Sequence, residues 1–222
     1  VIHFGGNPNE MDIICKWAQS KHVLLVEDCA QALGAFYKDK MVGNFGDYSV
    51  FSLMKNLYSI SGGLLLSKNN MRSVYSSLPQ HVILYKTMKR FLEARCSYKE
   101  YNVYNILYYI LLLLKERGRK SIHGNCFQLT DKIVEEVTGC INQINHYNAL
   151  RVKNAEYMIN LIDDSKYMVQ QVIKDGKTNR NRLLFKSMEV PAISVIKYLR
   201  KKGIAANNLT QNYLNGYQSN IK

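Results

Sequence analysis

The sequence predicts an α/β fold, and three observations in its first 67 residues carry that prediction. Apolar residues recur at helical spacing from about Asn9 to Lys21, and Asn9 is a suitable N-terminal cap for such a helix. The continuous apolar run Val23–Val26 that follows is typical of a buried parallel strand. Further strands are expected at Tyr48–Leu53 and Gly63–Ser67, on either side of a short, tight segment. Helix and strand therefore alternate, as they do in sheets with parallel strands.

The rest of the chain becomes helical and then mixed. In chain order we expect a tyrosine-rich helical region over 69–118, a long helical period over 130–162, strands over 167–173 and 181–186, and a helix over 193–202 that Gly203 ends. The sequence is therefore expected to divide into a large domain at residues 1–124, a connecting long helix at 125–165 and the start of a small α/β domain at 166–222.

The composition is that of a globular chain with anionic partners. Of its 222 residues 47% are hydrophobic, which is enough to bury a core, and the formal charge is +13. A positive charge of this size favours phosphorylated substrates or other anions. The basic residues are spread along the whole sequence rather than gathered in one stripe, so we expect no nucleic-acid partner.

The cysteines and the apolar runs indicate a reducing compartment and no transmembrane segment. The five cysteines are scattered and show no metal-like grouping with the histidines, so we expect buried thiols in a reducing cytoplasm and no metal site; they are Cys15, Cys29, Cys96, Cys126 and Cys140. The most apolar run, Ile106–Leu114, is far shorter than the roughly 20 residues that a spanning helix needs. We expect no signal peptide, because the opening residues include no basic segment, and because Val1 is not an initiating Met we expect a fragment.

The apolar stretch Tyr101–Leu114 also allows a different kind of protein. Basic residues follow it at Lys115, Arg117, Arg119 and Lys120, and such a helix could lie on anionic lipid, as in a non-catalytic membrane-surface or interaction protein. An ordinary core or dimer-interface helix, whose basic end complements the helix dipole, explains the same pattern, and we prefer it.

Two polar residues follow apolar strands at positions where α/β sheets bind ligands. Asp28 stands at the carboxyl end of the first predicted strand, where it could serve a site or cap a helix, and Glu27 beside it is expected to face the other way. Lys55 comes directly after the strand at 48–53, and the glycine pair Gly62-Gly63 beyond it lets backbone approach a ligand closely. Taken singly, Lys55 is an ordinary surface lysine; the combination indicates a nucleophile at a binding site.

The motifs around these residues are similar to those of the DegT/DnrJ/StrS family of pyridoxal-phosphate-dependent sugar aminotransferases. That family's signature runs E-D-x-A-Q-A-x-G, then G-x-x-G-D, F-S, K-N and G-G. This chain carries the same motifs in the same order at 27–34, 43–47, 51–52, 55–56 and 62–63. The stretch at 3–12 and the segment Asn148-Ala149-Leu150-Arg151 also resemble family elements, but the resemblance is specific only within residues 1–67. It implies a partial three-layer αβα large domain of fold type I, followed by the start of the small domain.

The resemblance also implies a role for each of four residues. Lys55 would hold pyridoxal 5'-phosphate covalently and move a proton between the substrate's α-carbon and the C4′ carbon of the cofactor. Asp28 would pair with the pyridinium nitrogen and keep it protonated. Gln31 would contact the ring hydroxyl, and Ser52 would donate its hydroxyl to the cofactor phosphate, with Ser49 and Ser59 as rivals for that contact.

The implied reaction is transfer of an amino group, with glutamate as donor, to a keto-sugar nucleotide destined for a surface polysaccharide or natural product. The resemblance also implies a homodimer and a longer protein, whose N-terminal part would supply a phosphate cup and an aromatic residue that stacks on the cofactor ring; we expect the given chain to lack both. Two departures stand out: Ser52 and Lys55 are two residues closer than in most members, and Ser61 replaces a common acidic residue. The rival in this fold is a sugar dehydratase, in which histidine replaces the lysine, so Lys55 favours amino transfer.

Overall fold

The computed structural model describes residues 1–57, 59, 61–69, 76–77, 80–93, 95, 102–118 and 127–208. It divides into two compact units, one formed by 1–87, 120–162 and 169–184, the other by 88–119, 163–168 and 185–222. Several sequence features lie outside the described residues: Cys96, Cys126, Arg119, Lys120, the expected domain boundary at 124 and the tail from 209 onward.

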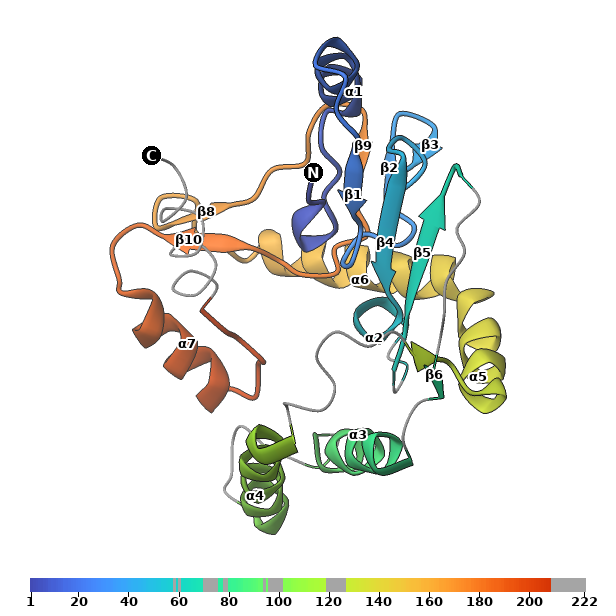
Figure 1. Ribbon diagram of the computed structural model, residues 1–222. Helices are drawn as coiled ribbons and strands as arrows, with labels where there is room; N and C mark the ends of the chain where they lie inside the picture. The colour runs from blue at the N-terminus through green and yellow to red at the C-terminus, as the bar shows by residue number, and fades with distance from the viewer. Residues whose placement is uncertain are drawn as a thin grey trace, which may run out of the picture. The chain divides into compact units, whose positions relative to one another are not determined.

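A three-stranded sheet in the order β1-β4-β5 forms the centre of the first unit (Figure 1). The strands are β1 (Val26–Asp28), β4 (Tyr48–Ser52) and β5 (Gly63–Ser67). β1 and β4 are parallel, with Asp28 opposite Val50, whereas β5 is antiparallel to β4, with Gly63 opposite Ser52. The glycine pair therefore lies beside the carboxyl end of β4, where the sequence motif is expected to let backbone approach a ligand.

The predicted buried strand at Val23–Val26 was wrong in its bounds and in its burial. Val23 and Leu24 are exposed, and the regular ladder begins only at Val26. The reason lies in Leu25, whose backbone N–H donates to the Asp47 carboxylate at 2.8 Å and so is tied to a side chain. The ladder partner of β1 starts at Tyr48, so the apolar run enters the sheet only at its last residue.

The other elements of this unit are helices and a small second sheet. The helical elements are η1 (Phe4–Gly6), α1 (Met11–Ser20), α2 (Leu53–Asn56), α5 (Asp131–Ile141) and α6 (Ile144–Ile159). The second sheet has the order β3-β2-β9, from Lys40–Met41, Phe36–Tyr37 and Gly176–Lys177, and a short parallel pair joins β6 (Ser76–Ser77) to β7 (Phe127–Gln128). The long helix expected over 130–162 is thus two helices, interrupted by a turn at Asn142 and Gln143.

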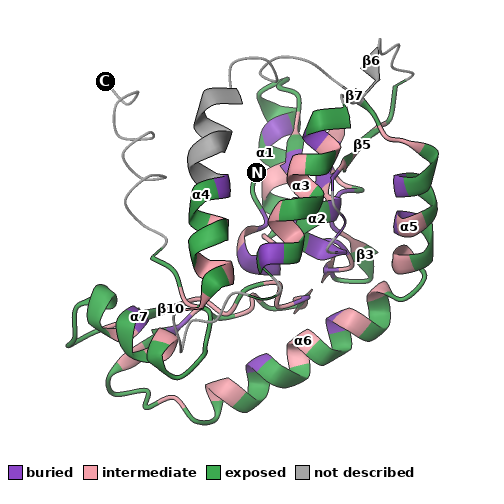
Figure 2. Ribbon diagram, turned by 90° about the horizontal axis from the view of Figure 1, so that it is seen from below, coloured by how far each residue is buried: buried purple, intermediate pink, exposed green. Residues whose placement is uncertain are grey.

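The core of this unit lies under one face of the sheet. Phe51 of β4 packs with residues of the loop after β1 and with α5, in a buried cluster that comprises Cys29, Ala32, Leu33, Ala35, Val42, Phe51, Leu53, Leu57, Ile133 and Val137. Figure 2 shows exposed, intermediate and buried positions in turn along α6; Asn148 and Ala155 are the two that are buried. The stretch 169–184, expected in the small domain, belongs to this unit: β9 pairs with β2, and the Asn179 N–H donates to the Gly6 carbonyl.

The second unit is mainly helical. It contains the end of α3 (Gln80–Glu93), α4 (Val103–Gly118) and α7 (Ala192–Lys201), together with β10 (Phe185–Ser187), which pairs with β8 (Tyr167–Val169). The helix expected at 193–202 is confirmed within one residue, and Gly203 follows it at φ +81°. Within the described part of the chain, no helix is both long and apolar enough to cross a membrane.

Candidate functional site

The four residues predicted from the sequence come from one edge of the central sheet. Asp28 ends β1 and Ser52 ends β4, and because these strands are parallel their carboxyl ends lie side by side. Gln31 follows Asp28 by three residues, and Lys55 lies on α2, which begins directly after β4. Open α/β sheets bind ligands at this edge.

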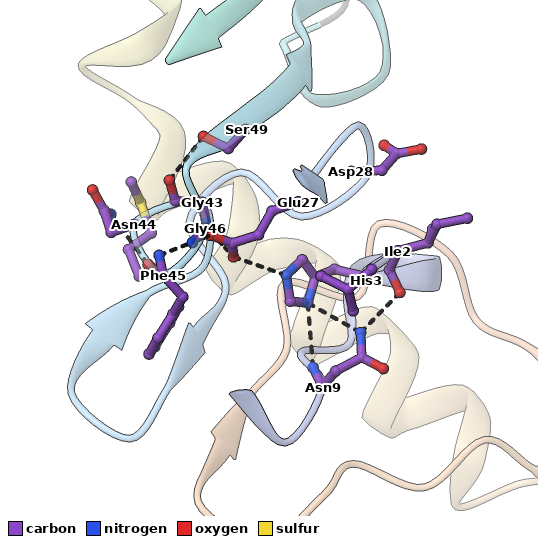
Figure 3. A network of polar contacts seen from close by, with 12 residues as sticks. Ile2, His3, Asn9, Glu27, Asp28, Gly43, Asn44, Phe45, Gly46 and Ser49 are labelled. Atoms are coloured by element: carbon purple, nitrogen blue, oxygen red, sulfur yellow. Dashed lines mark hydrogen bonds and ion pairs between the residues drawn. The ribbon is translucent and has the colours of Figure 1, made fainter. Parts of the chain in front are cut away.

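Asp28 and Glu27 point to opposite sides of β1, as strand alternation requires. Figure 3 shows the Asp28 carboxylate turned away from the network around Glu27. Asp28 is half-buried, and its Oδ1 accepts a hydrogen bond from the Ala30 N–H at 2.9 Å. Its second oxygen has no protein partner among the described residues. The capping role that the sequence also allows for Asp28 therefore uses only one of its two carboxylate oxygens.

Ser52 and Lys55 meet at the start of α2. Ser52 is the N-terminal cap of this helix, and its Oγ accepts from the Lys55 backbone N–H at 3.3 Å. That bond uses a lone pair and leaves the hydroxyl hydrogen to be donated elsewhere. The Lys55 side chain is exposed, and its ammonium group has no ion pair in the described part of the chain.

Gln31 is fixed from one side. Its Oε1 accepts from the Gly5 backbone N–H at 2.9 Å, and Gly5 has φ +71°, a conformation that glycine adopts freely. The amide oxygen is thereby oriented, and no hydrogen bond from the two N–H groups of the side chain is made to any described residue, which leaves them as donors.

The two rival serines use their hydroxyls internally. Ser49 is buried and donates to the Gly43 carbonyl at 2.8 Å, and Ser59 is buried and donates to the Ser61 carbonyl at 2.7 Å. A donor already engaged with a buried carbonyl would have to leave it unsatisfied to reach a phosphate. Ser52 is therefore the best placed of the three serines.

The residues at this edge of the sheet have hydrogen-bond donors and acceptors of the kinds that pyridoxal phosphate needs. Asp28 offers a carboxylate oxygen for a protonated ring nitrogen, Gln31 offers N–H donors for a ring oxygen, and Ser52 offers a hydroxyl for a phosphate. Lys55, on α2, offers an amine that forms no ion pair with any residue that the structure describes.

Glu27 organises the loop that runs behind this edge. Its two oxygens accept from the backbone N–H groups of Gly43, Phe45 and Gly46 at 2.7, 2.7 and 2.5 Å, and it pairs with His3 at 3.1 Å (Figure 3). Burial alone would raise the pKa of Glu27, but the hydrogen bonds from His3 and these N–H groups outweigh it and lower the pKa below its ordinary value. The sequence predicts its orientation but not these partners.

Cys29 joins His3 and Glu27 in a buried group whose potential ligand atoms lie within 4.8 Å of one another. Burial, and then the charge of Glu27, raises the pKa of the Cys29 thiol, which keeps it protonated. The spacing of cysteines and histidines in the sequence did not predict this group. To bind a cation it would have to give up hydrogen bonds to both oxygens of Glu27 and the proton of the Cys29 thiol.

Sequence reasoning missed a set of buried asparagines next to the site. Asn56 and Asn179 are fully buried and Asn148 is nearly so, and all three hydrogen-bond to the backbone of Leu33, in the loop after β1. The available signals were the asparagine beside Lys55 and the Asn-Ala-Leu-Arg segment, which the resemblance included without assigning a role.

Part of the chain is similar in sequence to a known sugar-nucleotide enzyme, and most of it is similar in fold to solved structures. GDP-perosamine synthase of Escherichia coli O157:H7 is 39% identical over 70 residues, which are 31% of this chain and 19% of that enzyme. The aminotransferase TlmJ from Streptoalloteichus hindustanus has a similar fold, with a TM-score of 0.60, 17% identity, and coverage of 91% of this chain and 49% of TlmJ.

A second solved structure with the same fold contains the cofactor. It is the Escherichia coli GDP-4-keto-6-deoxy-D-mannose-3-dehydratase with bound hydrated PLP, with a TM-score of 0.58 at 21% identity, covering 98% of this chain and 55% of that one. The chain thus spans about half the length of these solved structures. The model of the DegT/DnrJ/EryC1/StrS aminotransferase family matches residues 1–210, and the chain belongs to that family.

Proposed function

We propose that this chain carries the lysine-bearing part of a pyridoxal-phosphate-dependent aminotransferase that acts on a nucleotide-linked keto sugar. One observation supports this most strongly: a carboxylate, an amide, a hydroxyl and a lysine stand at one sheet edge, each with the required donor or acceptor available. Family membership supports the same reaction, and the lysine at position 55 favours amino transfer over dehydration.

Each residue has a separate task in this proposal. Asp28 holds a proton on the ring nitrogen, Gln31 donates to the ring oxygen, and Ser52 donates to the phosphate. Lys55 holds the cofactor and then moves a proton as a general acid and base. When bound, pyridoxal phosphate supplies the electron sink that stabilises negative charge on the substrate carbon.

The proposed substrates and surroundings follow from charge and family. Glutamate is the proposed amino donor and a keto-sugar nucleotide the acceptor, whose diphosphate suits a chain with a formal charge of +13. The product would enter a surface polysaccharide or natural product. The free thiols of Cys15, Cys29 and Cys140 support a cytoplasmic location. We further propose that the protein works as a homodimer, as the family resemblance implies.

Trapping the cofactor on Lys55 tests this proposal. Pyridoxal phosphate is added to the 222-residue chain, borohydride reduces any lysine–cofactor bond, and peptide mapping locates it. We expect the label on Lys55 in the wild type and its loss in Lys55→Ala. Lys16→Ala, which removes another exposed lysine of the same unit, is the matched control and should keep the label. Label spread over surface lysines, or none at Lys55, would contradict the proposal.

A further inference from the structure

The backbone of the Lys55 helix is held by side chains from distant parts of the chain. α2 is a single turn, and the carbonyl groups of so short a helix have few partners within the helix. The Leu53 carbonyl accepts from the Leu57 N–H at 2.8 Å. The Lys55 carbonyl instead accepts from Asn181 Nδ2 at 2.9 Å, and the Asn56 carbonyl accepts from Arg151 Nη2 at 2.6 Å. These two donors lie 126 and 95 positions away in the sequence.

Arg151 and Asn181 are themselves anchored. The second terminal nitrogen of Arg151 donates to Asn148 Oδ1 at 2.7 Å, and Asn148 in turn donates to the Leu33 carbonyl at 3.0 Å. The Asn181 backbone N–H donates to Asn179 Oδ1 at 3.0 Å, and Asn179 Nδ2 donates to the same Leu33 carbonyl at 3.0 Å. The hydrogen bonds that anchor Arg151 and those that anchor Asn181 therefore both lead to one backbone carbonyl, that of Leu33 in the loop after β1.

Asn56 closes this network from the side of the helix. Its side chain is fully buried, donates to the carbonyls of Ala30 and Ser52 at 3.0 and 2.7 Å, and accepts from the Leu33 N–H at 3.3 Å. The hydrogen bonds of Asn56 thus connect the loop after Asp28, which carries Gln31, to the helix that carries Lys55. A buried, satisfied network of this kind fixes a unique local geometry.

We propose that Asn181 and Arg151 are positioning residues for Lys55, setting the place of its amine through the two carbonyls that end α2. The Lys55 side chain is exposed and forms no ion pair with the described residues. The position of its amine therefore depends mainly on the backbone that carries it. A displacement of about 1 Å at a reacting group can cost ~100-fold in rate, so small backbone movements matter. The link to cofactor attachment rests on the function proposed above.

The test compares Asn181→Ala and Arg151→Lys with the wild-type chain. Asn181→Ala removes one of the two side-chain donors, whereas Arg151→Lys keeps the charge but replaces the planar guanidinium, whose two terminal nitrogens reach the two acceptors, with a single ammonium group. Asn44→Ala is the matched control, because Asn44 makes an exposed side-chain bond to the Met41 carbonyl at 3.1 Å in the same unit.

The first measurement is hydrogen exchange of backbone amides without cofactor. Loss of one hydrogen bond should speed exchange at the Lys55 and Leu57 amides by ~5-fold in Asn181→Ala, with a smaller change in Arg151→Lys and none in Asn44→Ala. Exchange at Val50 in β4 should stay as in the wild type. Unchanged exchange in α2, or an equal increase throughout the sheet, would overturn the proposal, the second result indicating a general structural role.

The second measurement is the borohydride trapping rate at saturating pyridoxal phosphate. We expect ~10-fold slower labelling of Lys55 in Asn181→Ala, while acylation of Lys16 by an amine reagent stays unchanged. Labelling at the wild-type rate in both variants would overturn the proposal. A wild-type chain that is not labelled at all would instead contradict the proposed function, and the exchange result would still decide whether α2 is positioned by these two side chains.

Discussion

The two faces of the central sheet carry the same kinds of residue in opposite environments. On one face Glu27, Ser49 and Phe51 are buried, with Phe51 only 3% exposed; on the other, Asp28 and Ser52 are half-buried and Val50 is 37% exposed. Glu27 and Asp28 are neighbours and both are carboxylates, yet one is saturated by backbone N–H groups and the other keeps an oxygen available. Strand alternation alone separates the structural acid from the acid of the candidate site.

Removal of the Glu27 side chain should have the largest effect on stability of the substitutions that compare the two faces. Glu27→Ala leaves three backbone N–H groups and His3 without their acceptor in a buried place, so the free energy of unfolding should fall by about 4 kcal/mol. Urea unfolding followed by circular dichroism measures this. Asp28→Ala, on the opposite face, should change the free energy by less than about 1 kcal/mol. Equal losses in the two variants would show that the faces do not differ as described.

Two apolar residues of β4, Phe51 on the buried face and Val50 on the exposed face, allow the same comparison without a change of charge. Phe51→Ala removes a ring from the buried cluster and should lower the free energy of unfolding by about 3 kcal/mol. The ring is closely packed, because a Cβ at Gly43 would stand only 2.3 Å from Phe51 Cζ. Val50→Ala, one residue earlier, should cost less than about 1 kcal/mol, and thermal unfolding of the two variants compares them. A Val50 effect as large as that of Phe51 would mean that the exposed face is covered in solution.

Acid should affect the Glu27 face selectively. The folded pKa of Glu27 lies below its ordinary value of 4.5, so its stabilising contribution is complete above that value and is lost as pH falls through the lower folded pKa. We expect the difference in unfolding free energy between wild type and Glu27→Gln to be largest near about pH 7 and to shrink towards about pH 3. Urea titrations across that range measure it. A difference independent of pH would show that Glu27 is not ionised in the folded protein.

Much of the sheet edge could be predicted from the sequence, because the relevant signals are local. An apolar stretch followed by Asp28 places that residue at a strand end, and another places Lys55 shortly after one; the parallel pairing of β1 with β4 brings those strand ends together. Strand β5 was also predicted at its observed bounds, although nothing in the run Gly63–Ser67 indicates that it pairs antiparallel.

What could not be predicted depends on contacts far apart in the chain. Leu25 is apolar and continues a strand-like run, but its N–H is taken by Asp47, which no local pattern reveals. Asn148 and Asn179 look like surface residues by composition, yet each donates to Leu33 across more than a hundred positions of sequence, 115 and 146. Short polar side chains that bond to backbone leave no periodic signal, so they escape any analysis of apolar patterns.

The cap at the start of α2 has a consequence for the hydroxyl that makes it. Since Ser52 Oγ accepts the Lys55 N–H, electrostatic repulsion keeps the hydroxyl hydrogen of Ser52 away from that N–H. The hydrogen bond that caps α2 therefore also limits the rotation of the Ser52 hydroxyl before an anion binds. Less rotational freedom is then lost on binding, so the local folding of one turn preorganises the contact that we propose between Ser52 and the cofactor phosphate.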